Sequence, residues 1–338
     1  MKKIAALLFI SVSLFACKKK KGIPDVSGIK VDIPIERFDQ SYFSIDTNNI
    51  TAGLSKLSQE HPGFYGDFMQ EILGVSGANT DSNTILVTKE ILKSYTVVFN
   101  SIQPEYKKTD WLKKELEKAF QFVKYYFPDY KTGKAILFVG PFDAPGVAIT
   151  ANGIAIGLQL FAGKDFSIYQ VPEVLELFPL YISRRFSKEY ITANCMKGVI
   201  LELFPDNSSA KPLVEQMIEK GKQWWLLDKF LPTAPDSVKT GFTKTQLDWC
   251  KRNEGMIWSE IIRTTDLNSI NQLDIQTFIG EAPFTQGFSP ENSPGNLGQW
   301  IGWQIVKKFV SKNPNMNPEE VMRMDARKIL EIAKYKPR

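Results

Sequence analysis

Apolar residues recur at helical spacing in the first part of the chain. Between residues 110 and 127 they share one helical face, with Asp110 as a plausible N-cap and Pro128 as the stop. The members of this stripe are Leu112, Leu116, Ala119, Phe120, Val123 and Phe127. Another helix is expected after Pro62, carrying Phe68 and Ile72. Residues 36–130 are therefore predicted to be mostly helical.

The hydrophobic period changes in the middle of the chain. The apolar run Ala135–Val139 lies between glycines and predicts a buried strand. The segments Val147–Thr150 and Ile154–Gly157 flank Asn152-Gly153, a strong hairpin signal because both residues tolerate positive φ. A small sheet of at least three strands follows from these segments.

The C-terminal half returns to helical spacing. Pro179 interrupts an apolar stretch and predicts a kink or two helices. Long helices are expected at residues 212–230, 245–262 and 296–310, and Asn317 to Glu320 resembles a capping box. In the last long helix, Gly298 and Gly302 permit close packing against a neighbouring helix.

The chain shows no internal repeat and no long linker after residue 35. Residues 36–338 are therefore predicted to form a single globular α+β domain, mostly helical, with a small three- or four-stranded sheet.

The N-terminus carries an export signal. Lys2 and Lys3 precede thirteen mainly apolar residues, too few for a spanning helix, which needs about 20. Leu14 to Cys17 resembles the bacterial lipobox, in which the cysteine is acylated and the chain is cut just before it. We thus expect a signal peptide at 1–16, lipid attachment at Cys17, and an extended tether over 17–35. The alternative is an ordinary secretory signal with an incidental thiol.

The net positive charge of the chain is concentrated at this N-terminal end. The 338 residues carry a formal net charge of +5, but residues 1–21 hold six lysines and no acidic residue. The remaining 36 basic and 37 acidic residues nearly cancel. No nucleic-acid-binding face is therefore expected, and the lysines at 18–21 are expected near lipid headgroups or in a solvated spacer.

Residue counts exclude several enzyme classes. The chain has one histidine, His61, so a zinc peptidase of the H-E-x-x-H type cannot be built. No nucleophile elbow, Walker motif or dinucleotide glycine pattern occurs. Neither a metal nor another cofactor is expected, and His61 is interpreted as a surface residue or one with satisfied hydrogen bonds.

Other candidate groups have ordinary structural interpretations beside the functional ones. The pairs Glu173/Glu176 and Glu215/Glu219 each share a helical face, as surface glutamates commonly do. Cys195 and Cys250 are interpreted as buried free thiols, with a disulfide as the alternative. The C-terminal tryptophans (Trp224, Trp225, Trp258, Trp300 and Trp303) are interpreted as core, with a sugar or peptide platform as the alternative.

Several segments in order resemble the gliding-motility lipoprotein GldB family of Bacteroidota. They are Tyr126–Tyr130, Met217–Lys222, Gln246–Trp249 with Asn253-Glu254, Pro283–Thr285, Ser289-Pro290 and Gly298–Gly302. The resemblance implies an envelope lipoprotein needed for gliding, working beside the gliding and type IX secretion machinery, without an established enzymatic activity. Only the acylation site transfers, onto Cys17.

A weaker likeness concerns the order of elements. Helices, a sheet with a hairpin, and further helices resemble the layout of gluzincin-type peptidases. The stretch Val171–Arg185, where those enzymes carry both metal-binding histidines, has no histidine and is interrupted by Pro179. The likeness would imply a metal-free zincin-like scaffold.

These observations favour a non-enzymatic, lipid-anchored accessory or structural protein of the cell envelope. The resemblance also implies an orientation, because surface-exported lipoproteins of this phylum tend to carry acidic residues just after the cysteine. Lysines follow Cys17 here, so we expect the protein to face the periplasm, with inner or outer membrane left open. Its partners would be envelope proteins of the gliding machinery, contacted through the proline-rich loop 283–294 with Phe284 and Phe288. The alternatives are a loop folded onto its own domain, and a glycan- or peptide-binding lipoprotein or carboxylate-based hydrolase.

Overall fold

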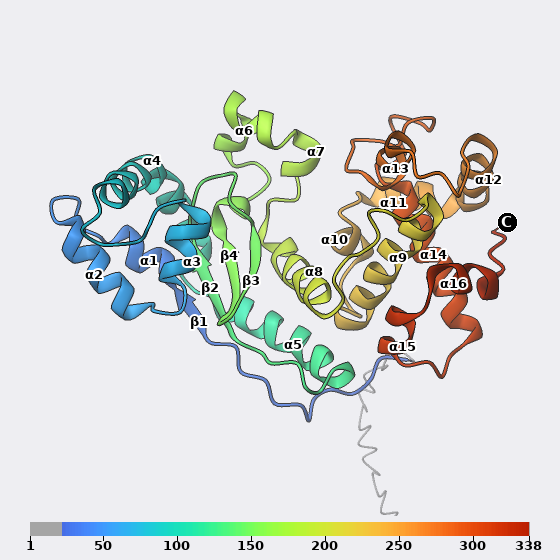
Figure 1. Cartoon of the computed structure of the whole chain (residues 1–338), viewed down its shortest axis with the longest axis horizontal. Coiled ribbons are helices and arrows are strands. Elements are labelled where there is room, and N and C mark those ends of the chain that lie inside the picture. The colour runs from blue at the N-terminus through green and yellow to red at the C-terminus, as the bar shows by residue number, and fades with distance from the viewer. Residues whose placement is uncertain (1–21, 338) are drawn as a thin grey trace, which may run out of the picture.

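The computed structural model describes residues 22–337, so the predicted signal peptide, Cys17 and the lysines at 18–21 lie outside the described residues. Three groups of elements follow one another along the chain (Figure 1). The first comprises β1 (Ile35–Arg37), α1 (Phe38–Phe43), α2 (Ile50–Glu60), α3 (Tyr65–Asp67), a π-helical turn at Phe68–Ile72, α4 (Ser82–Tyr106) and α5 (Asp110–Tyr126).

The second group completes the sheet and the third is helical. The second comprises β2 (Lys134–Phe138), β3 (Val147–Thr150), β4 (Gly153–Gly157), α6 (Pro172–Leu177), α7 (Leu180–Ser183), α8 (Ile191–Leu203) and 3₁₀ turns at Leu158–Leu160, Ser167–Gln170 and Lys188–Tyr190. The third comprises α9 (Leu213–Phe230), α10 (Asp236–Thr240), α11 (Lys244–Arg252), α12 (Glu254–Thr264), α13 (Gln272–Ile279), α14 (Leu297–Lys312), α15 (Pro318–Arg323) and α16 (Ala326–Ala333).

The sheet has four strands in the order β1-β2-β4-β3. Strands β1, β2 and β4 are parallel, and β3 is an antiparallel edge strand. The predicted hairpin is confirmed, although Ala151 and Asn152 form the turn and only Gly153 has a positive φ, of 142°. A Cβ at Gly153 would lie 2.1 Å from the Lys134 carbonyl oxygen, so this close strand approach requires glycine.

The sheet forms the middle layer of its half of the molecule. Because successive side chains alternate between the two faces, Leu137 and Ile156 pack on the core shared with α5 and α8. Ile136 and Phe138 pack on a separate aromatic core with α1, α2 and the π-helical turn. Both faces are buried, which explains why β2 reads as a continuous apolar run.

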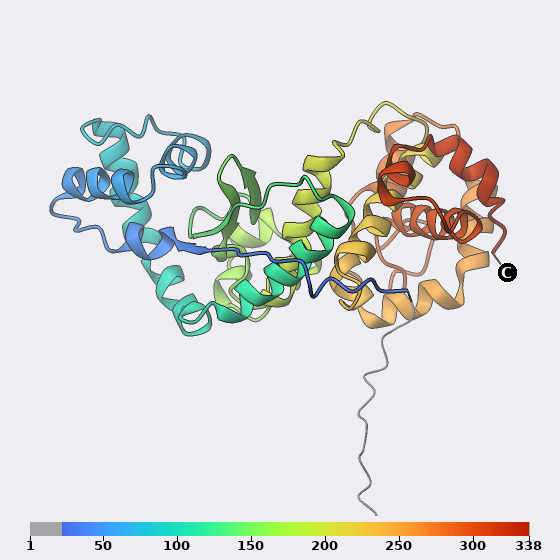
Figure 2. The same ribbon diagram turned by 90° about the horizontal axis from the view of Figure 1, so that it is seen from below.

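Strand β1 was not predicted and changes the interpretation of the N-terminus. Residues 22–34 run along α5 on the underside of the molecule (Figure 2). Gln121 Nε2 donates to the Ile29 carbonyl oxygen at 2.9 Å, and Lys113 Nζ lies 2.6 Å from Asp32 Oδ1. Ile33 is buried in the main core. The described part of the expected tether is therefore packed on the folded body.

The C-terminal helices assemble around one close crossing, α9 against α14. A Cβ at Gly302 would lie 1.7 Å from the Met217 carbonyl oxygen, and one at Gly221 would lie 2.2 Å from the carbonyl carbon of Gly302. Backbone therefore meets backbone at this point, as the glycine spacing in α14 predicts.

The mostly helical α+β fold is confirmed, with four strands. Pro179 separates α6 from α7, and the capping box at Asn317 and Glu320 is present. Further details differ from the prediction. The helix expected after Pro62 is the short α3 followed by a π-helical turn, the helix expected at 245–262 divides at Asn253, and Thr109 rather than Asp110 occupies the N-cap of α5.

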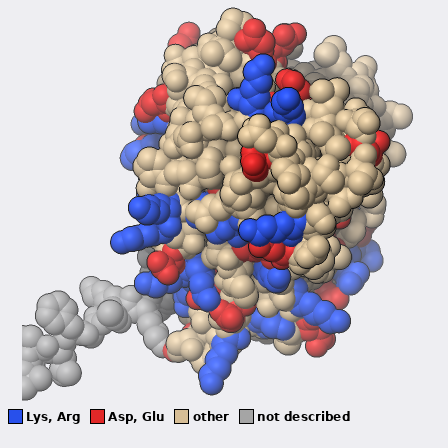
Figure 3. Space-filling model, turned by 90° about the vertical axis from the view of Figure 1, so that its left-hand side faces the viewer, with Lys and Arg blue, Asp and Glu red and all other residues tan. Residues whose placement is uncertain are grey.

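Charged residues of both signs mix on the end of the molecule that carries α1–α4 (Figure 3). Lysines and arginines alternate there with acidic residues, around a broad uncharged area. Within residues 22–337, no helix is both long and apolar enough to span a bilayer.

Candidate functional site

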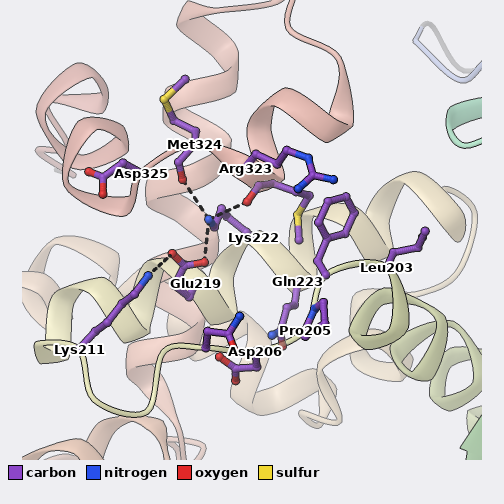
Figure 4. A pocket seen from close by; sticks show the side chains of 13 residues that line it. Leu203, Pro205, Asp206, Lys211, Glu219, Lys222, Gln223, Arg323, Met324 and Asp325 are labelled. Carbon is purple, nitrogen blue, oxygen red and sulfur yellow. Dashed lines mark hydrogen bonds and ion pairs between the residues drawn. The ribbon is translucent and has the colours of Figure 1, made fainter.

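Two hollows flank α9 in the C-terminal half. The larger, about 460 Å³, opens between the loop after α8, one side of α9 and the segment around α15 (Figure 4). Its lining residues are Leu203, Phe204, Pro205, Asp206, Asn207, Lys211, Glu219, Lys222, Gln223, Met322, Arg323, Met324 and Asp325.

Three charged groups of the larger hollow, Lys211, Glu219 and Lys222, satisfy one another. Lys222 is buried, and its Nζ donates to the carbonyl oxygens of Met322 and Met324 at 2.9 and 3.0 Å. The same ammonium lies 2.7 Å from Glu219 Oε2, while Lys211 pairs with the other oxygen of that carboxylate (Figure 4). Lys222 therefore holds the C-terminal end of α15 on α9, which is a structural role.

The smaller hollow is a cavity of about 180 Å³ between α8, α9 and the start of α14. Its lining residues are Arg185, Lys197, Ile200, Leu201, Lys220, Gln223, Trp224, Thr240, Glu281, Asn296 and Gln299. We call it the Lys197 cavity. It differs from the larger hollow in holding a lysine, Lys197, without a hydrogen-bond or ion-pair partner among residues 22–337.

Of the basic residues that line this cavity, Lys197 is the one without a partner among residues 22–337. Arg185 Nη2 lies 3.0 Å from Glu281 Oε2, and Lys220 is paired with Asp206. Lys197, which is partly buried on α8, has no hydrogen bond or ion pair to any residue among 22–337. Burial, together with the positive charge of Arg185, lowers the pKa of Lys197 to about 8.

Asn296 brings an unsatisfied acceptor to the same cavity. It occupies the N-cap of α14 with a φ of 47°, a left-handed conformation that asparagine tolerates better than most residues. The residue is 4% exposed, and its Oδ1 has no hydrogen-bond donor within the described residues. Its Nδ2 lies 3.4 Å from Glu281 Oε1.

Sequence reasoning missed both Lys197 and Asn296 as site residues. One signal was available for the lysine, because Lys197 is the only charged residue in the otherwise apolar and small stretch Ile191–Leu201. Nothing local marks Asn296 beyond its position before a predicted helix.

The residues singled out from sequence have mainly structural roles. His61 Nδ1 lies 2.7 Å from Glu36 Oε1, and its Nε2 lies 2.9 Å from Ser41 Oγ, so the interpretation as a satisfied histidine is confirmed. Glu215 pairs with Arg327 and Glu219 with two lysines. Glu173 and Glu176 are exposed on α6.

The tryptophans and cysteines belong mainly to the core. Four of the five predicted core tryptophans are at least 92% buried, and Trp258 packs its ring edge against Tyr335. Cys195 and Cys250 are free and buried, as predicted. Burial raises the pKa of both thiols, which opposes a nucleophilic role.

The loop 283–294 is partly packed on its own domain. Phe284 and Phe288 are both partly buried, and the Phe288 ring meets Trp249 edge-on with centroids 6.3 Å apart. The buried Thr285 donates through Oγ1 to the Pro294 carbonyl oxygen at 2.9 Å, which closes the loop. The loop is therefore fixed in one conformation, and the aromatic rings of Phe284 and Phe288 remain partly exposed on it.

The peptidase-like interpretation gains no support. The stretch Val171–Arg185 forms the two short helices α6 and α7 rather than one long helix. No cluster of three or more His, Cys, Asp or Glu suited to a metal occurs within residues 22–337.

Comparison with known proteins identifies the family. Neither the curated proteins nor the solved structures contain a match to the chain. The family model described as "Gliding motility protein GldB" matches residues 19–337, nearly the whole sequence, as the segment order had implied. The chain therefore belongs to the GldB family of gliding motility lipoproteins.

Proposed function

We propose that the protein is a lipid-anchored accessory component of the gliding apparatus that acts through contacts with other envelope proteins rather than through catalysis. The observation that carries this proposal is the family match over residues 19–337. The paired state of Glu215 and Glu219 supports it, because carboxylates engaged in ion pairs are poor candidates for acid–base chemistry.

The N-terminal arm, residues 22–34, bears on how the folded body would lie relative to the bilayer. Lipid attachment at Cys17 leaves at most about 18 Å of extended chain before Gly22. The arm is bonded to α5 further along, at Ile29 and Asp32, so the anchor would hold the underside of the molecule close to a bilayer (Figure 2). The lysines at 18–21 would meet anionic headgroups at about 1 kcal/mol each. We place this bilayer contact on the periplasmic side.

The test of the anchored role is Cys17→Ser in living cells. We expect the variant protein to be made and folded but released from the membrane fraction, and the cells to stop gliding, because a single sulfur carries the lipid. Fractionation with immunoblotting and colony-spreading assays measure the two results. Cells that glide normally with a released protein would contradict the proposal.

The proposed partner surface is the loop 283–294. In the double variant Phe284→Ser/Phe288→Ser, we expect gliding to be impaired while the thermal unfolding midpoint falls by only a few degrees, because both rings are partly exposed. Crosslinking in living cells should then lose at least one adduct seen with the native loop. An unchanged set of adducts and normal gliding would exclude the loop as the contact.

A further inference from the structure

The Lys197 cavity is charged more positively than the chain requires for its own structure. Its lining holds three cations, Arg185, Lys197 and Lys220, and one carboxylate, Glu281. Arg185 pairs with Glu281, and Lys220 pairs with Asp206 of the larger hollow. Arg185 and Lys220 engage these two carboxylates, so Lys197 has no ion pair among residues 22–337, and the Glu281 charge acts on it only from a longer distance. A charge that is partly withdrawn from water without a partner is costly, so the missing partner calls for an explanation.

Lys222 shows how this chain satisfies a buried lysine when the role is structural. Its ammonium has two carbonyl acceptors and one carboxylate within 3.0 Å. Lys197 lies on the adjacent helix and has no such acceptor among residues 22–337. The acceptor for Lys197 would therefore come from outside the part of the chain that the structure describes.

The cavity also needs a donor from its occupant. Asn296 Oδ1 is buried and accepts no hydrogen bond within the described residues. The Gln223 amide, which also lines the cavity, has no hydrogen bond there either. An occupant that satisfies both Lys197 and Asn296 must offer a negative group to the ammonium and an N–H or O–H donor to the amide oxygen.

The charge and size of the cavity further restrict which ligands could occupy it. One uncompensated positive charge matches a monoanion such as a carboxylate, and the nearby Glu281 disfavours a phosphate dianion. The start of α14 adds a favourable field for a negative group. A volume of about 180 Å³ with an apolar wall of Ile200, Leu201 and Trp224 suits one small residue.

We propose that the Lys197 cavity binds the free carboxyl end of a peptide, with the carboxylate at Lys197 Nζ and the N–H of the same residue at Asn296 Oδ1. A C-terminal residue carries both the carboxylate and the N–H donor, and the cavity volume suits one such residue. This binding activity goes beyond the accessory role proposed above and does not depend on the loop 283–294.

The test is calorimetric titration of the full-length lipoprotein in detergent at pH 7. The probes are acetyl-Ala-Ala with a free carboxylate, the same peptide as a C-terminal amide, and acetate. We expect the acid to bind at least tenfold more tightly than either the amide or acetate. Equal affinity for acid and amide would overturn the proposal, and acetate binding as tightly as the peptide would overturn the peptide part of it.

Variants localise the binding. Lys197→Met should weaken binding of the acid at least tenfold, whereas Lys308→Met, which removes an exposed lysine on α14, should leave it unchanged. Asn296→Asp should also weaken binding, because it places a second negative charge beside the ligand carboxylate. Thermal unfolding checks that each variant is folded. Unweakened binding in folded Lys197→Met, or in folded Asn296→Asp if the first variant does not fold, would overturn the proposal.

Discussion

At the residue scale, two lysines on adjacent helices have opposite energetic roles. The Lys222 ammonium is fully engaged and ties α15 to α9. The Lys197 ammonium has no partner among residues 22–337 and lies close to Arg185. A residue that lowers the stability of the fold and makes no structural contact is typical of a binding site, because selection for function can retain it.

The cost of Lys197 should be visible in the pH dependence of stability. Its pKa of about 8 in the folded protein lies below the value of about 10.4 expected in the unfolded chain. Between these values the unfolded state binds the proton and the native state does not, so this group makes stability rise with pH. Below pH 8 the full penalty applies, about 1–2 kcal/mol after allowing for partial exposure.

We therefore expect Lys197→Met to be more stable than the native protein by about 1–2 kcal/mol at pH 7. This advantage should fade as pH rises from 8 to 10.5. The neighbouring pairs Arg185–Glu281 and Lys220–Asp206 are present in both proteins and cancel in the comparison. Urea unfolding at four pH values measures the difference, with Lys308→Met as the control. A difference that is constant with pH would show that Lys197 is not desolvated.

At the element scale, the C-terminal half depends on the crossing of α9 and α14. Gly302 and Gly221 bring the two backbones into direct contact, and Trp300 and Trp303 of α14 are buried around this point. The crossing also fixes the Lys197 cavity, since α9 supplies Lys220 and Gln223 while the start of α14 supplies Asn296.

Gly302→Ala should therefore destabilise the protein by roughly 3 kcal/mol, because the new methyl group would overlap the Met217 carbonyl oxygen and force the helices apart. Gly66→Ala is the matched control, because a Cβ at Gly66 would meet no atom within 4 Å. Thermal unfolding of the two variants provides the measurement. Equal midpoints would mean that the crossing is looser than the described backbone distances.

Local signals predicted the elements that depend on neighbouring residues. The glycine spacing of α14, the hairpin before Gly153 and the capping box at Asn317 are each readable within a few positions. Strand β1 was missed because it has only three residues and pairs with β2, about 100 positions later. The sequence did not predict the Lys197 cavity for the same reason, because its lining comes from several separate segments between Arg185 and Gln299.

At the scale of the whole molecule, the arm decides how the body would sit relative to a membrane. Strand β1 joins the sheet, Ile33 enters the main core, and the bonds from Lys113 and Gln121 fix residues 29–32 on α5. The chain thus becomes part of the body well before the end of the stretch first assigned to a tether. With Cys17 acylated, the protein would be held at a short distance from the bilayer rather than at the end of a long flexible linker.

Ile33→Asp should release this arm while leaving the lipid in place. A carboxylate at this buried position would be desolvated without a partner, so the arm would detach from α5 and expose position 33 to water. We expect proteinase K to cut the arm at least tenfold faster, membrane attachment to be unchanged, and gliding to fall because the body no longer keeps its orientation. Lys30→Asp, at an exposed position of the same arm, should behave like the native protein. Equal protease resistance in the two variants would mean that the contacts of residues 29–33 do not hold the arm, and normal gliding with a released arm would mean that orientation does not matter.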